Sequence, residues 1–260
     1  AVISAGNTGA SMATSLIILG TLAGVERPAI ATLLPTLSGT SMMLDVGANV
    51  DCKPVHLLQF AIMGHVFAKR ILGVASPRVG LLSIGEEDTK GNELTKEVFR
   101  ELKRLPINFI GNVEGRDVYI GGADVVVCDG FIGNVALKIS EGLSDAIVKF
   151  LRREILLSLR GKIGYYFLKP AFANFKKKID YAEYGGAPLL GIDGISIICH
   201  GRSSPKAIKN AVKVAVDFSE RKVNEHIHQD IEMQMALYEG GQERESQKGE
   251  KKVLKSEEEG

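Results

Sequence analysis

The chain has 260 residues, and its 32 basic and 31 acidic side chains leave a formal net charge of +1. This balance excludes a globally basic nucleic-acid-binding protein and an acidic disordered chain. With 45% hydrophobic and 24% charged residues, the composition is typical of a packed globular protein. The three cysteines show no CxxC spacing, which argues against a disulfide framework or a zinc site, so we expect no bound metal.

Short apolar runs alternate with amphipathic stretches along most of the chain. A strand end at residues 1–4 precedes a turn at 6–9 and a helix that extends to about residue 23. Further strands are predicted at residues 30–34, 42–46, 79–84, 109–113, 124–128 and 195–199. Helices are predicted at residues 55–72, 92–105, 135–159 and 205–238. Strands that alternate with helices form βαβ units, so we expect a three-layer α/β fold with a mostly parallel sheet.

Most of the predicted strands end in a turn that contains glycine, and ligands of such sheets bind at the carboxyl ends of the strands. The Gly-Asn-Thr-Gly turn at residues 6–9 opens a helix, whose free N–H groups suit an anion such as phosphate. Ser4, Asn7 and Thr8 add hydrogen-bonding groups. A tight strand-to-helix turn without a ligand explains the same pattern.

The turn at residues 85–92 contains Lys90 beside Gly91. A lysine here could neutralise phosphate and the oxyanion of an attacked carbonyl group. Alternatively, Lys90 forms a surface ion pair with Glu86 or Asp88.

The turn at residues 129–134 has the same layout, and Asn134 lies where the following helix is predicted to start. Its amide could cap that helix or bind a substrate oxygen. Asp45 and Asn49 follow another strand, where an aspartate orients neighbouring loops or caps a helix.

Other candidate catalytic groups give weaker signals. His200 follows the last strand and is the best-placed imidazole for acid–base chemistry, although a lone histidine is more often structural. Cys128 lies in an apolar run, which predicts a buried, inert thiol. The sequence contains no GxSxG motif and no Ser-His-Asp arrangement, so a covalent acyl-enzyme is not favoured.

Residues 147–184 hold eight of the sixteen aromatic residues, and nine basic against three acidic side chains give them a local charge of +6. Apolar side chains recur there at helical spacing, which predicts an amphipathic helical hairpin with a basic rim. Such a hairpin favours a dimer contact or an anionic membrane surface, and the two are compatible. Nucleic-acid stacking is less favoured, because the rest of the chain offers no basic groove. The expected contact residues are Phe150, Leu151, Ile155, Phe172 and Phe175.

Six of these segments, taken together and in this order, resemble the bacterial phosphate acyltransferases of phospholipid synthesis. They are Ser-Ala-Gly-Asn-Thr-Gly-Ala (4–10), Leu-Asp-Val-Gly-Ala-Asn-Val-Asp-Cys-Lys-Pro (44–54), Lys-Gly-Asn-Glu-Leu-Thr-Lys (90–96), Asp-Gly-Phe-Ile-Gly-Asn-Val (129–135), Tyr-Gly-Gly-Ala-Pro-Leu-Leu-Gly (184–191) and His-Gly-Arg-Ser-Ser (200–204).

The resemblance implies transfer of a long fatty acyl chain from acyl carrier protein to inorganic phosphate, without a cofactor. It also implies a fold related to isocitrate and isopropylmalate dehydrogenases, a homodimer, and a cytoplasmic protein at the inner face of the cell membrane. Lys90 and Asn134 match the residues to which the family's catalysis is ascribed. The implied phosphate and acyl contacts are Ser4, Gly6, Asn7, Thr8, Gly9, Asp45, Asn49, Gly91, Asn92, Gly133, Tyr184, Gly185, Gly186 and His200.

The resemblance also predicts how the chain is divided. The family pattern begins with about 80 residues and an Asp-Ala-Met-Gly-Gly-Asp turn that this sequence lacks, so we expect a fragment. Residues 1–240 would form the acyltransferase domain, and residues 241–260, eleven of them charged, would form a disordered tail.

The hypothetical mechanism places phosphate on the 6–9 turn with Lys90, where it attacks the thioester carbonyl directly while Asn134 holds the oxyanion. Two alternatives stay open. One is an NAD- and metal-dependent decarboxylating dehydrogenase of related fold, which would need clustered aspartates and arginines. The other is a membrane-bound scaffold that recruits acyl carrier protein through its basic face.

Overall fold

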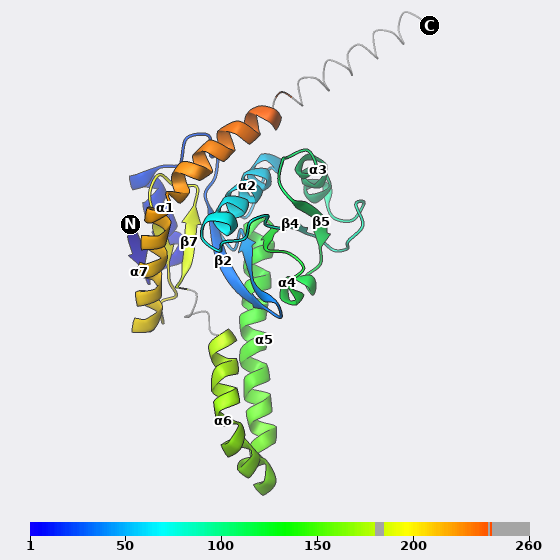
Figure 1. Ribbon diagram of the computed structural model, residues 1–260, viewed down its shortest axis with the longest axis vertical. Coiled ribbons are helices and arrows are strands. Elements are labelled where there is room, and N and C mark those ends of the chain that lie inside the picture. Colours follow the sequence, from blue (N-terminus) through cyan, green and yellow to red (C-terminus); the bar gives the residue numbers. More distant parts are fainter. Residues whose placement is uncertain (180–184, 239, 241–260) are drawn as a thin grey trace, which may run out of the picture.

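The computed structural model of the protein describes residues 1–179, 185–238 and 240. Its eight strands form one sheet in the order β1-β8-β7-β2-β3-β6-β4-β5 (Figure 1). The strands are β1 (Val2–Ser4), β2 (Ala29–Thr36), β3 (Gly39–Leu44), β4 (Val79–Leu82), β5 (Phe109–Val113), β6 (Val125–Val127), β7 (Ala187–Leu190) and β8 (Ser196–Ile198). The helices are α1 (Thr8–Leu19), α2 (Pro54–Arg70), α3 (Glu93–Leu102), α4 (Asp117–Ile120), α5 (Gly130–Leu156), α6 (Leu159–Ile179) and α7 (Pro205–Glu220), followed by a helix over residues 223–238.

The sheet is mixed but mostly parallel, as predicted. Strands β3, β6, β4 and β5 pair in parallel, and so do β1 and β8. The pairs β2–β3, β2–β7 and β7–β8 are antiparallel. These three reversals make β1 and β8 run opposite to β3, β4, β5 and β6. The carboxyl ends of the two parallel groups therefore lie at opposite edges of the sheet.

Alternate residues of the central strands face two different helical layers, as expected for strands covered on both faces. In β3, Met42 and Leu44 belong to the core that contains Phe60 of α2. The residue between them, Met43, belongs to a second core that contains Val118 of α4. The predicted three-layer α/β arrangement is confirmed.

Several helix boundaries differ from the prediction, and α1 ends at Leu19 rather than at about residue 23. Helix α5 begins at Gly130 rather than residue 135, because Asp129 is its N-cap and accepts a hydrogen bond from Ile132 N at 2.8 Å. The helix predicted over 205–238 is interrupted after Glu220, where Lys222 has a φ of 50°.

Strand β7 and helix α4 were not predicted from the sequence. Strand β7 has only four residues, includes a proline and is flanked by glycines, so no alternating pattern marks it. Helix α4 also has only four residues, which is too short to show helical periodicity.

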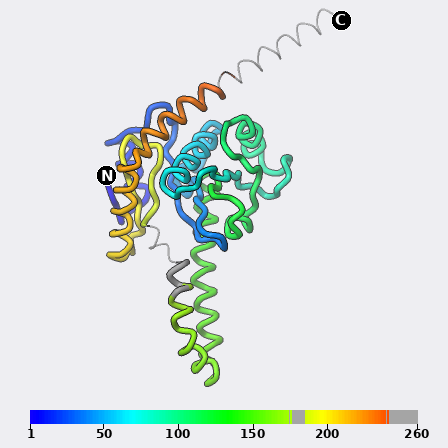
Figure 2. Tube along the Cα trace, in the orientation of Figure 1, coloured from blue at the N-terminus to red at the C-terminus, as the bar shows by residue number. Residues whose placement is uncertain are grey.

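Helices α5 and α6 pack on each other and protrude from the body of the molecule (Figures 1 and 2). The break between them lies at residues 157–158, and Pro170 lies inside α6. Phe150, Leu151 and Phe175 are exposed, as a contact surface requires. Ile155 and Phe172 are half-buried, and Phe172 packs on Tyr165 with ring centroids 5.4 Å apart.

Part of the predicted organisation lies outside the described residues, namely the 241–260 tail and the end of the 147–184 segment. Among the described helices, none combines the length and apolarity that crossing a membrane requires.

Candidate functional site

Three of the predicted turns surround one cavity at the carboxyl ends of β3, β4 and β6. The cavity measures about 460 Å³, within the range of small-molecule sites. We call it the strand-end cavity. Its lining residues come from the loop after β3, from the start of α3 and from the start of α5, and they are Val50, Asp51, Cys52, Asn92, Leu94, Asp129, Phe131 and Ile132.

Asp45 organises the loop that follows β3. Its side chain is fully buried, and Oδ1 accepts hydrogen bonds from the amides of Ile30 and Ala48, each at 3.0 Å. Oδ2 accepts from the backbone N of Asn49 at 2.7 Å and from its Nδ2 at 2.9 Å. Burial raises the pKa of Asp45, and the hydrogen bonds from Ala48, Asn49 and Ile30 oppose that rise. The predicted substrate contact at Asp45 is therefore corrected to a structural role, because its oxygens are occupied within the loop.

Asn49 joins this loop to the start of α5. Its Nδ2 also donates to the carbonyl of Pro28 at 2.8 Å, and its own carbonyl accepts from Gly130 N at 2.7 Å. A Cβ on Gly130 would lie 2.6 Å from that Asn49 oxygen, and one on Gly133 would overlap the Asp45 carbonyl oxygen. Gly133 was predicted to contact substrate, but the structure shows that it and Gly130 let the helix approach the loop.

Asn134 lies in the second turn of α5 with an exposed side chain. A Cβ added to Gly47 would lie 3.5 Å from Cγ of Asn134, so the Asn134 amide lies beside the loop after β3. It makes no hydrogen bond with any described residue, and Asp129 performs the capping. Of the two predicted roles, capping is wrong, and the amide is free to bind a ligand.

Lys90 is exposed and has no ion-pair partner within the part of the chain that the structure describes. The predicted surface pairing is wrong, because both candidate carboxylates are engaged elsewhere. Glu86 pairs with Arg116 at 3.3 Å, and Asp88 pairs with Lys103 at 2.6 Å. The ammonium group of Lys90 is therefore available to an anion.

The residues after Lys90 complete the turn into α3. Gly91 has a φ of 113°, and a Cβ there would overlap Oγ1 of Thr95. Asn92 is the N-cap of α3, with Oδ1 accepting from Thr95 N at 2.9 Å. Gly91 and Asn92 were predicted to contact substrate. The structure gives both a role in shaping the turn, and Asn92 also lines the strand-end cavity.

The two cysteines near this cavity carry unreactive thiols. Burial raises the pKa of Cys52 to about 11. A hydrogen bond from Gly130 opposes this rise, and neighbouring carboxylates such as Asp45 add to it. Cys128 is buried, as predicted, and burial raises its pKa well above the usual range. Both thiols are protonated at neutral pH, and the thiolate is the nucleophilic form of cysteine.

The other predicted site residues gather at the opposite edge of the sheet. Asn7 is the N-cap of α1 and accepts from Ala10 N at 2.9 Å. Ser4 accepts a hydrogen bond from Ser11 Oγ at 2.7 Å. Gly6 and Gly9 are exposed around this turn, as is Thr8, the first residue of α1.

The end of β8 joins the same edge, where the Cys199 amide donates to the Ser4 carbonyl at 2.7 Å. His200 is exposed, and its Nδ1 accepts from Arg202 N at 3.1 Å. Gly185 and Gly186 precede β7 with φ values of 78° and 88°. A Cβ on Gly186 would lie 2.9 Å from the sulfur of Cys199. Tyr184 lies outside the described residues.

The hypothesis that phosphate lies on the 6–9 turn together with Lys90 requires these two turns to share one crevice, and within a single chain they do not. The β2–β3 hairpin and the antiparallel β7 reverse the strand direction between the two groups. Phosphate held between the 6–9 turn and Lys90 is therefore not supported within one chain. The sequence did contain a signal of the reversal, because the strands predicted at 30–34 and 42–46 are joined by residues 35–41, a connection too short for a parallel crossover.

The chain matches the family model described as "Fatty acid synthesis protein" over residues 1–226. It is 56% identical over 238 residues to the phosphate acyltransferase of Geobacter sulfurreducens, covering 92% of this chain and 69% of the relative. This chain belongs to the phosphate acyltransferase family. The phosphate acyltransferase of Thermodesulfovibrio yellowstonii is 58% identical over 231 residues, covering 89% of this chain and 67% of the relative. The resemblance stated from the six motifs is confirmed, and the chain spans about two thirds of the length of these acyltransferases.

Solved structures of phosphotransacetylases share the fold of this family member at low sequence identity. The EutD phosphotransacetylase from Staphylococcus aureus aligns with a TM-score of 0.55 at 16% identity, covering 82% of this chain and 60% of that one. A phosphotransacetylase from Streptococcus pyogenes aligns with a TM-score of 0.50 at 16% identity, covering 88% and 62%. At this identity the likeness concerns the fold alone.

Proposed function

We propose that this protein transfers a long fatty acyl chain from acyl carrier protein to inorganic phosphate, giving acyl phosphate for phospholipid synthesis. One observation carries the proposal beyond membership of the family. The strand-end cavity adjoins both the turn that carries the exposed Lys90 and the first turns of α5, which carry Asn134. Neither of these two side chains has a polar partner among the residues that the structure describes.

In the proposed reaction, an oxygen of phosphate attacks the thioester carbonyl carbon. The new C–O bond forms, the C–S bond breaks, and the thiolate leaves with the carrier protein and takes up the proton that the attacking hydrogen phosphate loses. Lys90 neutralises the phosphate, while the Asn134 amide stabilises the oxyanion. Positioning two bound reactants supplies much of the acceleration. The protonated thiols of Cys52 and Cys128 favour this direct attack over an acyl-enzyme.

The test is an assay of acyl phosphate formation from acyl carrier protein thioester and phosphate. We expect Lys90→Ala to lower the rate about 100-fold, the size of effect that follows the loss of one electrostatic contact to a transition state. Lys69→Ala is the control, because Lys69 is an exposed lysine in the last turn of α2, whose first turn is the one next to the strand-end cavity. Full activity of Lys90→Ala would overturn the role of Lys90. Reduction of NAD would favour the dehydrogenase, and carrier binding without turnover would favour the scaffold.

We propose that a second copy of the chain covers α5. Six apolar side chains recur along it at intervals of three or four residues and are 43–64% exposed, namely Ile132, Val135, Ile139, Leu143, Ile147 and Phe150. Leu137, which lies off this stripe, is half-buried and packs against the core that contains Met43. A straight, exposed apolar stripe on a 27-residue helix suits packing against the same stripe of a twin subunit.

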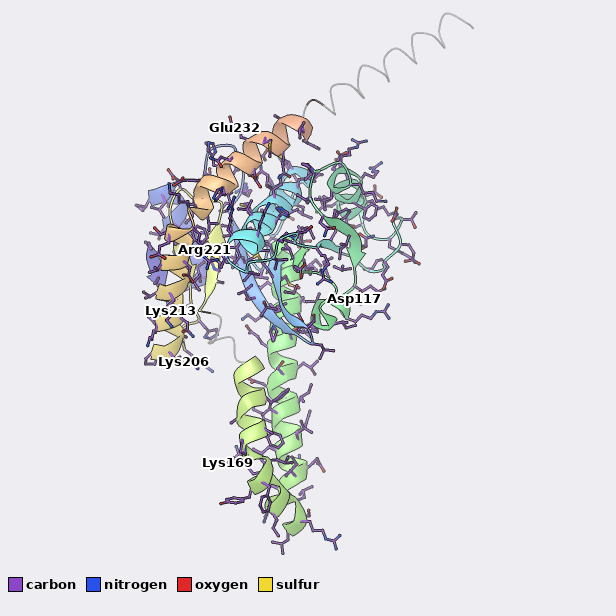
Figure 3. All side chains as sticks on the ribbon, in the orientation of Figure 1. Asp117, Lys169, Lys206, Lys213, Arg221 and Glu232 are labelled. Atoms are coloured by element: carbon purple, nitrogen blue, oxygen red, sulfur yellow. The ribbon has the colours of Figure 1, made fainter. Side chains whose placement is uncertain are left out.

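We further propose that the free end of the hairpin contacts an anionic membrane, which would place the protein at the inner face of the cell membrane. Leu157, Leu159 and Ile163 surround the break between α5 and α6 and are 54–75% exposed. The basic residues Arg152, Arg153, Arg160 and Lys162 are exposed around them. Lys169, farther along α6, continues this basic character (Figure 3). Exposed apolar side chains ringed by basic ones are typical of interfacial contacts with anionic lipid.

A further inference from the structure

Three side chains from three elements hold the loop that carries Lys90, residues 85–92. Lys103, at the end of α3, pairs with Asp88, and Arg116, before α4, pairs with Glu86. The third is Asn112 of β5, whose Nδ2 donates to the carbonyl of Glu87 at 2.9 Å. Glu86 and Asn112 line one surface pocket together with Asp117, which is labelled in Figure 3.

The Asn112 contact differs from the other two because it is buried and reaches the backbone of Lys90. Asn112 is 7% exposed. The Glu87 carbonyl that it holds also accepts the backbone N–H of Lys90 at 3.0 Å. One oxygen atom thus ties the buried strand β5 to the main chain of the lysine. The ion pairs join side chains that are 53–68% exposed, and pairs of that kind fix a loop only weakly.

The presence of a buried amide at this position needs an explanation. Oδ1 of Asn112 is buried and has no hydrogen-bond partner among the described residues. An unmatched buried oxygen carries a free-energy cost that an apolar side chain of similar size would avoid. The Nδ2 group accounts for the presence of asparagine here, because it donates to the Glu87 carbonyl and fixes its position.

We propose that Asn112 is a positioning residue for Lys90, acting through the carbonyl of Glu87. This inference rests on the proposed function, in which Lys90 neutralises phosphate. Asn112 itself contacts no reactant. Without its hydrogen bond only the two exposed ion pairs would hold the 85–92 loop, and the main chain of Lys90 would lose its fixed position relative to β5.

The test is a double-mutant cycle in the acyl phosphate assay. We expect Asn112→Ala to lower the rate at saturating substrates about 10-fold, as expected for one lost hydrogen bond. In the Lys90→Ala background the same change should cost less than about 2-fold, because the group that Asn112 positions is gone. Asn108→Ala is the matched control. Asn108 directly precedes β5, at the end of the strand opposite to Asn112, and its amide donates to the carbonyl of Ser76 at 3.4 Å.

The outcomes separate this inference from the function on which it rests. Full activity of Asn112→Ala beside a defective Lys90→Ala would overturn the inference alone, and so would an equal loss in both backgrounds. Full activity of Lys90→Ala would overturn both. If Asn112→Ala lowers the melting temperature more than Asn108→Ala does, the cycle is repeated with Asn112→Leu, which retains the branched shape and the number of non-hydrogen atoms and removes the hydrogen bond, and that cycle decides the question.

Discussion

Gly133 in the first turn of α5 lies directly against the main-chain carbonyl of Asp45 at the end of β3. The space between them is too small for a Cβ, which would overlap that oxygen and lie 2.8 Å from the sulfur of Cys128. Helix α5 is therefore set on the loop after β3 by backbone contact. The same helix carries Asn134 at this end and the exposed apolar stripe along its length, so this backbone contact fixes the positions of both.

This contact predicts that Gly133→Ala destabilises the protein. Overpacking of this kind costs about 1–3 kcal/mol, and displacement of α5 should also lower acyl phosphate formation by moving Asn134. The matched control is Gly142→Ala on the same helix, where nothing lies within 4 Å of the added Cβ. Replacing that glycine should stabilise by about 0.5–1 kcal/mol, because alanine favours helix. Thermal unfolding measures both, and equal stability of the two variants would contradict the seating described above.

The Cys52 thiol predicts a pH profile for alkylation at the strand-end cavity. Burial and nearby carboxylates raise its pKa to about 11, and the thiolate is the reactive form. The rate of alkylation by iodoacetamide should therefore rise about tenfold per pH unit from pH 7 to pH 10 without levelling off. Mass spectrometry locates the label, and Cys52→Ser supplies the background. A plateau near pH 8.5, as an ordinary thiol gives, would show that the cavity does not shield this residue.

Sequence reasoning located the chemistry-bearing turns but could not assign a role to each residue in them. The turns at 45–54, 85–92 and 129–134 were found because each follows an apolar strand and contains glycine. Asn92 and Asn134 have the same side chain in similar turns, yet only Asn92 is a cap. That difference depends on where each helix begins, which is set by Asp129 and by the tertiary contact at Gly133.

The grouping of the turns was beyond sequence reasoning for a different reason. Whether the carboxyl ends of two strands meet depends on the direction of every strand between them. Strand β7, with a proline and only four residues, reverses that direction. The sequence predicted each local element near 6–9 and near 85–92 well, but their placement at opposite edges is a property of the whole sheet.

The last prediction separates the two proposed contacts of the hairpin. Leu157 and Leu159 flank the break at its free end and are 70% and 75% exposed. Replacing both by Ser removes apolar area from the basic tip, so flotation with anionic vesicles should fall several-fold. The variant keeps the basic side chains of the tip, each of which contributes about 1 kcal/mol to binding. Sedimentation should still give a dimer, because the α5 stripe is intact.

The reciprocal variant is Ile139→Asp, in the middle of the stripe, where the side chain is 64% exposed. A carboxylate buried at a symmetric contact would face its own copy, so this variant should sediment as a monomer. As a monomer it should still float with anionic lipid, although more weakly because one tip binds in place of two. If the tip variant floated normally and Ile139→Asp did not float, the lipid contact would lie along the stripe rather than at the tip.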